Sequence, residues 1–163
     1  THGRTSKTWL DAKSKHEMRD LLSIIESAEK KKLETARLPY GKNDLSPVMS
    51  QDTLDYHYEK LAKGYADRYN NGEGDADFNY AGYFLHDLFF SQLMFPKGAN
   101  RPTGVSLELI ERQHKTFDQF REEIEIEAMK IQGSGWIYMS TSGNIKTIKN
   151  HEVKKDIALL IDW

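Results

Sequence analysis

Two histidines and one aspartate have the residue types and surroundings that could hold a metal ion. His57 and His86 each stand among apolar residues, and Asp162 ends the apolar run at 157–161. A carboxylate at the end of a buried strand must be paired, protonated or metal-bound to offset its desolvation. Two imidazoles and one carboxylate from separate elements would suit a redox-active Fe or Mn site with an open position. Taken singly, each histidine is more often a hydrogen-bonded core residue, so the ligand set alone leaves the question open.

Two helices are expected to carry these histidines. Ser50 is a typical N-cap residue, and the helix after it places four residues on one face, at i, i+3, i+7 and i+11: Leu54, His57, Leu61 and Tyr65. Residues 70–75, rich in Asn and Gly, predict a loop. A second helix is expected from about Asp77 to Leu93 and contains His86. The pattern therefore predicts an antiparallel helical hairpin.

The second half of the chain mixes helical and strand patterns. Residues 95–102 contain two prolines and break the helical period. Beyond them we expect helices at 106–113 and 117–130. Gly143-Asn144 predicts the turn of a hairpin, so that three strands are expected, at 135–140, 145–149 and 157–163. The fold class is therefore α+β: an antiparallel helical hairpin, then a mixed domain with a small antiparallel sheet of about three strands.

Three segments follow from these patterns. Residues 38–95 are expected to form the helical-hairpin domain and residues 96–163 an incomplete C-terminal α/β domain. Residues 1–37 form a basic N-terminal extension, in which apolar residues recur at helical spacing: Met18, Leu21, Leu22, Ile25 and Ala28. This helical extension is expected to pack on its own domain; the alternative is a docking helix for a partner or membrane surface, and so for a larger assembly.

Composition excludes several classes of protein. The 163 residues hold 23 Lys+Arg against 25 Asp+Glu, so the net charge of -2 gives no global attraction for nucleic acid or an anionic membrane. Zero Cys leaves no thiolate ligand or nucleophile. No apolar run approaches the roughly 20 residues of a membrane span, and no secretion signal is visible. We therefore expect no nucleic-acid or membrane partner, and a cytoplasmic or other soluble compartment.

Five motifs, in order along the chain from Leu38 to Trp163, resemble the iron/manganese superoxide dismutases. They are Leu38-Pro39-Tyr40 with Leu45-Ser46-Pro47; Tyr56-His57-Tyr58-Glu59-Lys60 with Tyr65 eight residues after His57; Phe84-Leu85-His86-Asp87-Leu88-Phe89-Phe90; Gly133-Ser134-Gly135-Trp136; and Leu159-Leu160-Ile161-Asp162-Trp163. Five motifs in the family's order make a chance match improbable.

The resemblance implies a role for each matching residue. His57, His86 and Asp162 would be metal ligands for Fe or Mn, with a slight preference for Fe from the His151 pattern. Tyr65 would be the hydroxyl at the substrate entrance, where the alternative is a core tyrosine with a satisfied hydroxyl. Trp136 would form a wall of the metal pocket, where the alternative is a core aromatic residue. His151 would hydrogen-bond the metal-bound solvent, with Gly82 leaving room for it; the alternative is a surface histidine.

Three departures from the family pattern bear on function. Leu61 stands where many members carry a His, and Phe90 replaces a common Trp. The family continues past the Asp with a Glu-His-Ala segment that supplies a fourth ligand. The printed sequence stops at Trp163, so the 163-residue form is expected to bind metal and dismutate superoxide poorly.

Two functions remain in view at this stage. The first is a superoxide dismutase, an oxidoreductase that converts superoxide to oxygen and hydrogen peroxide at a mononuclear Fe or Mn site and acts as a homodimer. The second is a non-catalytic, superoxide-dismutase-like structural subunit of a larger assembly. Retention of the three ligand positions with Tyr65 and Trp136 favours the first, because an unused site has no reason to keep buried polar groups.

Overall fold

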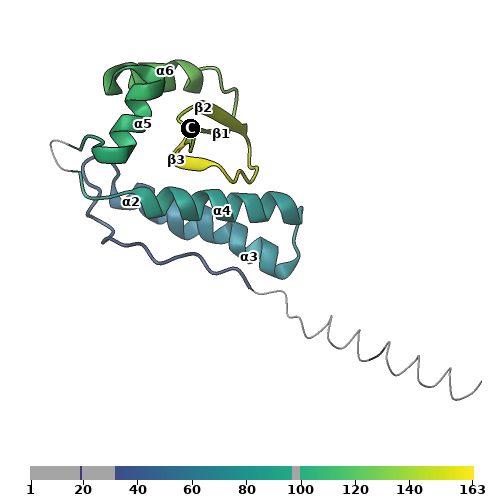
Figure 1. Ribbon diagram of the computed structural model, residues 1–163. Helices are drawn as coiled ribbons and strands as arrows, with labels where there is room; N and C mark the ends of the chain where they lie inside the picture. Colours follow the sequence, from purple (N-terminus) through teal and green to yellow (C-terminus); the bar gives the residue numbers. More distant parts are fainter. Residues whose placement is uncertain (1–18, 20–31, 97–99) are drawn as a thin grey trace, which may run out of the picture. The chain divides into compact units, whose positions relative to one another are not determined.

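The computed structural model describes Arg19 and residues 32–96 and 100–163. Leu33–Trp163 forms one compact unit (Figure 1). Of the helix expected around Met18 to Ala28, only Arg19 lies among the described residues, and it is helical. Among the described residues, no helix has both the length and the apolar character needed to cross a membrane.

The first half of this unit is a helical hairpin. One continuous helical segment consists of α2 (Gln51–Leu54), the π-helix η1 (Asp55–Ala62) and α3 (Lys63–Asn71). It is followed after a short loop by α4 (Ala76–Gln92), which packs alongside α3 (Figure 1). The predicted hairpin is confirmed.

Side-chain caps fix where these helices begin. The backbone N–H of Thr53 donates to Ser50 Oγ at 3.1 Å, and that of Phe78 donates to Asp75 Oδ1 at 2.7 Å. Each bond satisfies an amide that has no partner inside the first helical turn. Gly72, at φ 70°, ends α3 in the left-handed conformation that glycine adopts at little cost.

The π-helix was not predicted from the sequence. Its wider turns carry i→i+5 bonds, such as the one from Lys63 N–H to the Tyr58 carbonyl. Across this segment the buried positions recur every four residues: Leu54, Tyr58, Ala62 and Ala66. Leu61, expected on the apolar face, is 37% exposed.

The second half covers one side of this hairpin with a small sheet. Helices α5 (Gly104–His114) and α6 (Phe117–Ala128) precede strands β1 (Gly135–Ser140), β2 (Ile145–Lys149) and β3 (Ile157–Asp162). The antiparallel sheet has the order β2-β1-β3, so β1 is central and β3 is an edge strand. The predicted α+β class with three strands is confirmed, with helix ends within two residues of expectation.

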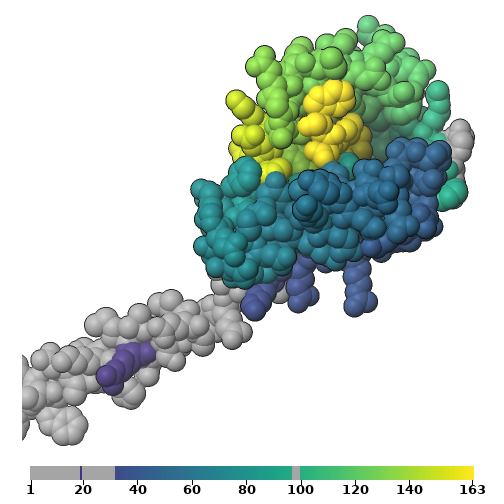
Figure 2. Space-filling model, turned by 180° about the vertical axis from the view of Figure 1, so that it is seen from behind, coloured from purple at the N-terminus to yellow at the C-terminus, as the bar shows by residue number. Residues whose placement is uncertain are grey.

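Two hydrophobic clusters hold these layers together. The larger one joins the hairpin to the sheet and includes Leu85, Phe90, Trp136 and Leu160. A smaller one joins α5 and α6 to the sheet through Ile110, Phe120 and Met139. The end of β3, drawn in yellow, reaches the surface beside the helical hairpin (Figure 2).

Candidate metal centre

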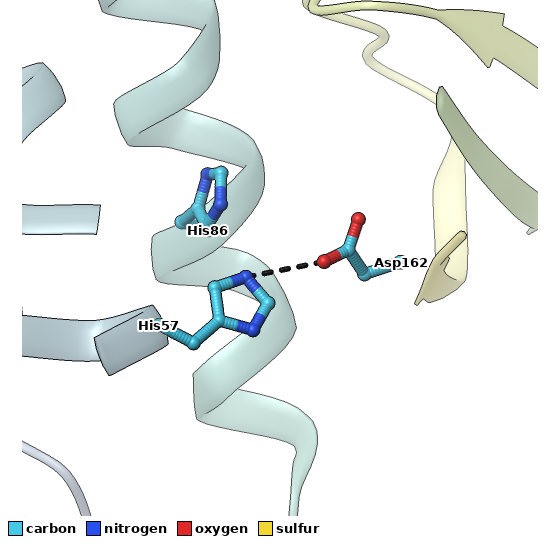
Figure 3. Close-up of side chains that lie close together, drawn as sticks. All are labelled: His57, His86 and Asp162. Carbon is cyan, nitrogen blue, oxygen red and sulfur yellow. Dashed lines mark ion pairs between the residues drawn. The ribbon is translucent and has the colours of Figure 1, made fainter. Parts of the chain in front are cut away.

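Three elements bring His57, His86 and Asp162 together. His57 comes from η1, His86 from α4 and Asp162 from the end of β3, and one ligand atom from each lies within 4.8 Å of the other two. His57 Nε2 lies 3.1 Å from Asp162 Oδ2 (Figure 3). The convergence of these three donors, far apart in sequence, is the arrangement that a metal ion requires.

His86 is buried in the form that can donate a lone pair. It is 4% exposed, and its Nδ1–H donates to the Gly82 carbonyl at 2.7 Å. This bond fixes the tautomer and leaves Nε2 as the ligand atom. Burial lowers the pKa of His86 to about 4, so the imidazole is neutral at pH 7.

His57 stands in a wall of aromatic rings. Its ring meets that of Phe90 edge-on at 5.0 Å between centroids and that of His86 at 5.1 Å. Phe90 is therefore in direct contact with the first histidine. The His57 side chain is only 16% exposed, whereas that of Asp162 is 32% exposed. The carboxylate side of the site is the more open one.

Gln92 ties the strand that carries Asp162 to the helix that carries His86. Its Nε2 donates to the Leu160 carbonyl at 3.0 Å, and its Oε1 accepts from the Leu160 N–H at 2.9 Å. Because β3 is an edge strand, these outward backbone groups have no strand partner. The Gln92 amide therefore takes the place of a neighbouring strand. Sequence reasoning missed this residue, since no motif marks it.

Tyr65, His151 and Trp136 form one hydrogen-bonded chain beside the centre. Trp136 Nε1–H donates to His151 Nδ1 at 3.0 Å, and His151 Nε2 lies 2.8 Å from Tyr65 Oη. Burial lowers the pKa of His151 and favours its neutral form. Since an indole can only donate, the neutral His151 carries its proton on Nε2 and donates it to Tyr65. The Tyr65 O–H is then left to donate elsewhere.

The rings of this chain pack on His86. Trp136, buried in the centre of the sheet, meets the His86 ring edge-on at 5.0 Å, and the Tyr65 ring lies 5.2 Å from it. Burial raises the pKa of Tyr65, and the nearby Asp162 charge adds to the rise. Tyr65 therefore stays protonated at neutral pH.

The Tyr65 ring packs closely against Gly82 of α4. A Cβ there would lie 2.6 Å from Tyr65 Cδ1, so the absence of a side chain at Gly82 gives room to the Tyr65 ring. His151 reaches the site from the other half of the molecule and bonds to the end of that ring. The structure adds the close packing of α3 on α4 at Gly82, and the room for His151 stays a prediction.

The fold and the site together define a class: an α+β protein with a candidate mononuclear centre of two histidines and one carboxylate. Residues 32–76 match the family model for the alpha-hairpin domain of iron/manganese superoxide dismutases, and residues 102–162 match that for their C-terminal domain. The chain belongs to the iron/manganese superoxide dismutase family, whose members are oxidoreductases.

Several curated relatives are similar to this chain. A superoxide dismutase [Fe] of Bacteroides fragilis is 33% identical over 126 residues, which are 66% of this chain and 65% of that protein. One of Sulfolobus acidocaldarius is 31% identical over 150 residues, or 74% and 71%. A superoxide dismutase [Mn/Fe] of Porphyromonas gingivalis is 33% identical over 132 residues, or 69% and 68%. The matches span about two thirds of each relative's length.

Proposed function

We propose that this chain converts superoxide to oxygen and hydrogen peroxide at a mononuclear Fe or Mn site held by His57, His86 and Asp162. The observation that carries the proposal is the convergence of these three donors within 4.8 Å in a chain of this family. The non-catalytic alternative is not favoured, because the relatives are named as superoxide dismutases and all three donors are kept.

The donor set fits a redox metal of this kind. Two neutral imidazoles and one carboxylate offer the nitrogen and oxygen ligands that suit Fe and Mn. Held by His57, His86 and Asp162, such a metal would supply one-electron redox chemistry, by which two superoxide ions and two protons would give one O₂ and one H₂O₂. Asp162 offsets part of the cation's charge. The names of the relatives, mostly [Fe] with one [Mn/Fe], support Fe with a slight preference.

Proton supply is the task that this proposal assigns to Tyr65 and His151. Peroxide formation consumes two protons, and Tyr65 has a hydroxyl proton to donate because His151 Nε2–H already donates to its oxygen. Trp136 holds His151 in the tautomer that makes this possible. Trp136 also walls the pocket through its contact with His86.

The domain division and the assembly are part of the same proposal. We place the helical-hairpin domain at 38–95 and the C-terminal domain at 96–163. The two histidine donors then belong to the first domain and the Asp162 carboxylate to the second. We further propose a homodimer. Leu61, on the same helical segment as His57 and 37% exposed, stands where many members carry a His, so we expect it to weaken one contact of that dimer.

Metal content and superoxide decay test the function. We expect the purified protein to accelerate superoxide decay, in stopped-flow or pulse-radiolysis measurements, in proportion to the Fe or Mn that it holds, and a His57→Gln variant to lose both metal and acceleration. A wild-type protein that holds stoichiometric metal yet leaves superoxide decay unchanged would contradict the proposal.

The role of Tyr65 has its own test. Tyr65→Phe keeps the ring and removes the hydroxyl, so turnover should fall by about 100-fold or more, in line with the loss of one acid–base group. The metal content and the thermal midpoint should stay close to those of the wild type. Unchanged turnover would leave Tyr65 as a packing residue only.

A further inference from the structure

Arg68 covers the ring of Tyr65. It follows Tyr65 by three residues on α3, and its Cζ lies 4.6 Å from the centroid of that ring. Residues three apart on a helix are surface neighbours. A guanidinium within about 6 Å of an aromatic face is attracted by the ring's quadrupole. The family resemblance did not single out this residue.

Other side chains hold the Arg68 guanidinium in place. Its Nε–H donates to Asn79 Oδ1 at 3.1 Å, and Asn79 Nδ2–H donates to the Glu73 carbonyl at 2.7 Å. Asn79 is 3% exposed, which makes it a fixed acceptor on α4. A Cβ at Gly64 would lie 3.1 Å from Arg68 Nη1, so the guanidinium also lies against the backbone of α3. These contacts therefore fix the position of the Arg68 guanidinium.

The surroundings of His151 give this cation a consequence. A groove of about 640 Å³ is lined in part by His151 and by three carboxylates, Asp75, Asp77 and Glu152. These negative charges repel an anion that approaches from the groove. The positive charge of Arg68 acts in the opposite sense, and it lies 4.6 Å from the centroid of the Tyr65 ring, whose hydroxyl is 2.8 Å from His151 Nε2. Its field thus reaches both members of the hydrogen-bonded pair.

We propose that Arg68 is a positioning residue: its guanidinium fixes the Tyr65 ring and supplies the positive charge that favours an anion beside Tyr65 and His151. The choice of superoxide as that anion rests on the proposed function. The placement of the ring does not, and it is tested separately.

The first measurement concerns the ring in the full chain without metal. Arg68→Gln keeps a partner for Asn79 but removes the planar cation, so the NMR signals of the Tyr65 ring should shift. Arg101→Gln is the matched control, because the guanidinium of Arg101 also lies near an aromatic ring, 5.7 Å from that of Phe117 on α6. The control should leave the Tyr65 signals unchanged. Tyr65 signals that shift no more in Arg68→Gln than in Arg101→Gln would overturn the positioning role.

The second measurement concerns anion binding in the Fe(III) protein. Azide, titrated by absorbance, should bind about threefold more weakly to Arg68→Gln, as expected for one lost charge acting through a well-solvated path. The difference should shrink at high salt. Superoxide decay at low ionic strength should slow by a similar factor. Equal azide affinity in Arg68→Gln and in the wild type would overturn the charge role.

Arg68→Lys separates the two roles and serves if Arg68→Gln does not fold. It keeps the charge and loses the planar fork, so azide affinity should stay near that of the wild type while the Tyr65 signals shift. If Tyr65 gives wild-type NMR signals in Arg68→Lys, the positioning role is overturned. If Arg68→Lys binds azide threefold more weakly than the wild type, the charge role is overturned. A wild-type protein that binds Fe and azide but leaves superoxide unchanged would contradict the proposed function alone.

Discussion

Two histidines, His86 and His114, are almost equally buried but are used in opposite ways. His86 is 4% exposed and donates from one ring nitrogen to a backbone carbonyl, while the other nitrogen faces His57 and Asp162. His114, at the end of α5, is 7% exposed and has a partner at each nitrogen. Its Nδ1 lies 2.6 Å from a Glu123 oxygen and its Nε2 2.7 Å from the Gly143 carbonyl.

The difference shows how a buried histidine reveals its use. His114 joins α5, α6 and the turn between β1 and β2, and each of its nitrogens already has a partner, so neither is an open donor for a metal. His86 keeps one. Burial and a neighbouring carboxylate are common to both regions, and the carboxylate contact is shorter at the structural histidine, 2.6 Å against 3.1 Å for His57 and Asp162. The count of occupied nitrogens separates the two uses.

Removing each histidine in turn gives the largest effect. His86→Gln deletes one metal donor. Loss of a residue that only supports a ligand costs up to about 100-fold in metal affinity, so loss of the ligand itself should cost more, and superoxide decay should be near background. His114→Gln should keep the metal content and lower the free energy of unfolding by about 1–3 kcal/mol, the cost of disturbing buried hydrogen bonds. Metal analysis and chemical denaturation on both variants check this. Lost metal in His114→Gln would break the comparison.

The pH dependence of the metal-free protein should also distinguish the two regions. Burial lowers the pKa of His86 from 6.5 to about 4, so the unfolded chain takes up this proton first. Stability is full above pH 6.5 and declines as the pH falls toward 4, by about 3 kcal/mol in total for a shift of this size. Denaturation curves measured at several pH values should show this decline. It should be smaller in His86→Gln, where His151, whose pKa burial also lowers, still contributes, and it should be unchanged in His114→Gln. A decline as large in His86→Gln as in the wild type would assign it to other groups.

Loss of the two hydrogen bonds from Gln92 to Leu160, the Gln92 clamp, should have the next largest effect. Gln92→Ala removes both hydrogen bonds to Leu160, so β3 should hold Asp162 less firmly and metal affinity should fall by about 10–100-fold. Competition with a chelator measures this change. Gln113→Ala, a change of the same size beside His114, should leave metal affinity unaltered. Equal affinities in Gln92→Ala and the wild type would show that the sheet positions Asp162 without the clamp.

The fold could be predicted from the sequence more fully than the contacts of the candidate site. Helix starts at Ser50 and near Asp75 were predictable because capping is a local interaction. The π-helix was not, since α-helical spacing carries no sign of i→i+5 bonding. The three donors could be named from the family resemblance, but Gln92 and Arg68 act through contacts between distant elements that no local pattern records. His114 gave no signal either, because its partners lie 9 and 29 residues away.

The smallest effect should come from changing one carboxylate to an amide. Glu123→Gln keeps an oxygen that can accept from His114 Nδ1 and removes a charge on a half-exposed side chain. Such pairs contribute about 0–1 kcal/mol, so the free energy of unfolding should fall by about 0.5 kcal/mol, with metal content unchanged. Asp162→Asn is the same chemical change beside His57, but there the carboxylate also has to offset the charge of a metal ion, which an amide cannot do. Metal affinity should therefore drop strongly in Asp162→Asn and not at all in Glu123→Gln. If the two variants retain metal equally, the carboxylate beside His57 has no more than the structural role of the one beside His114.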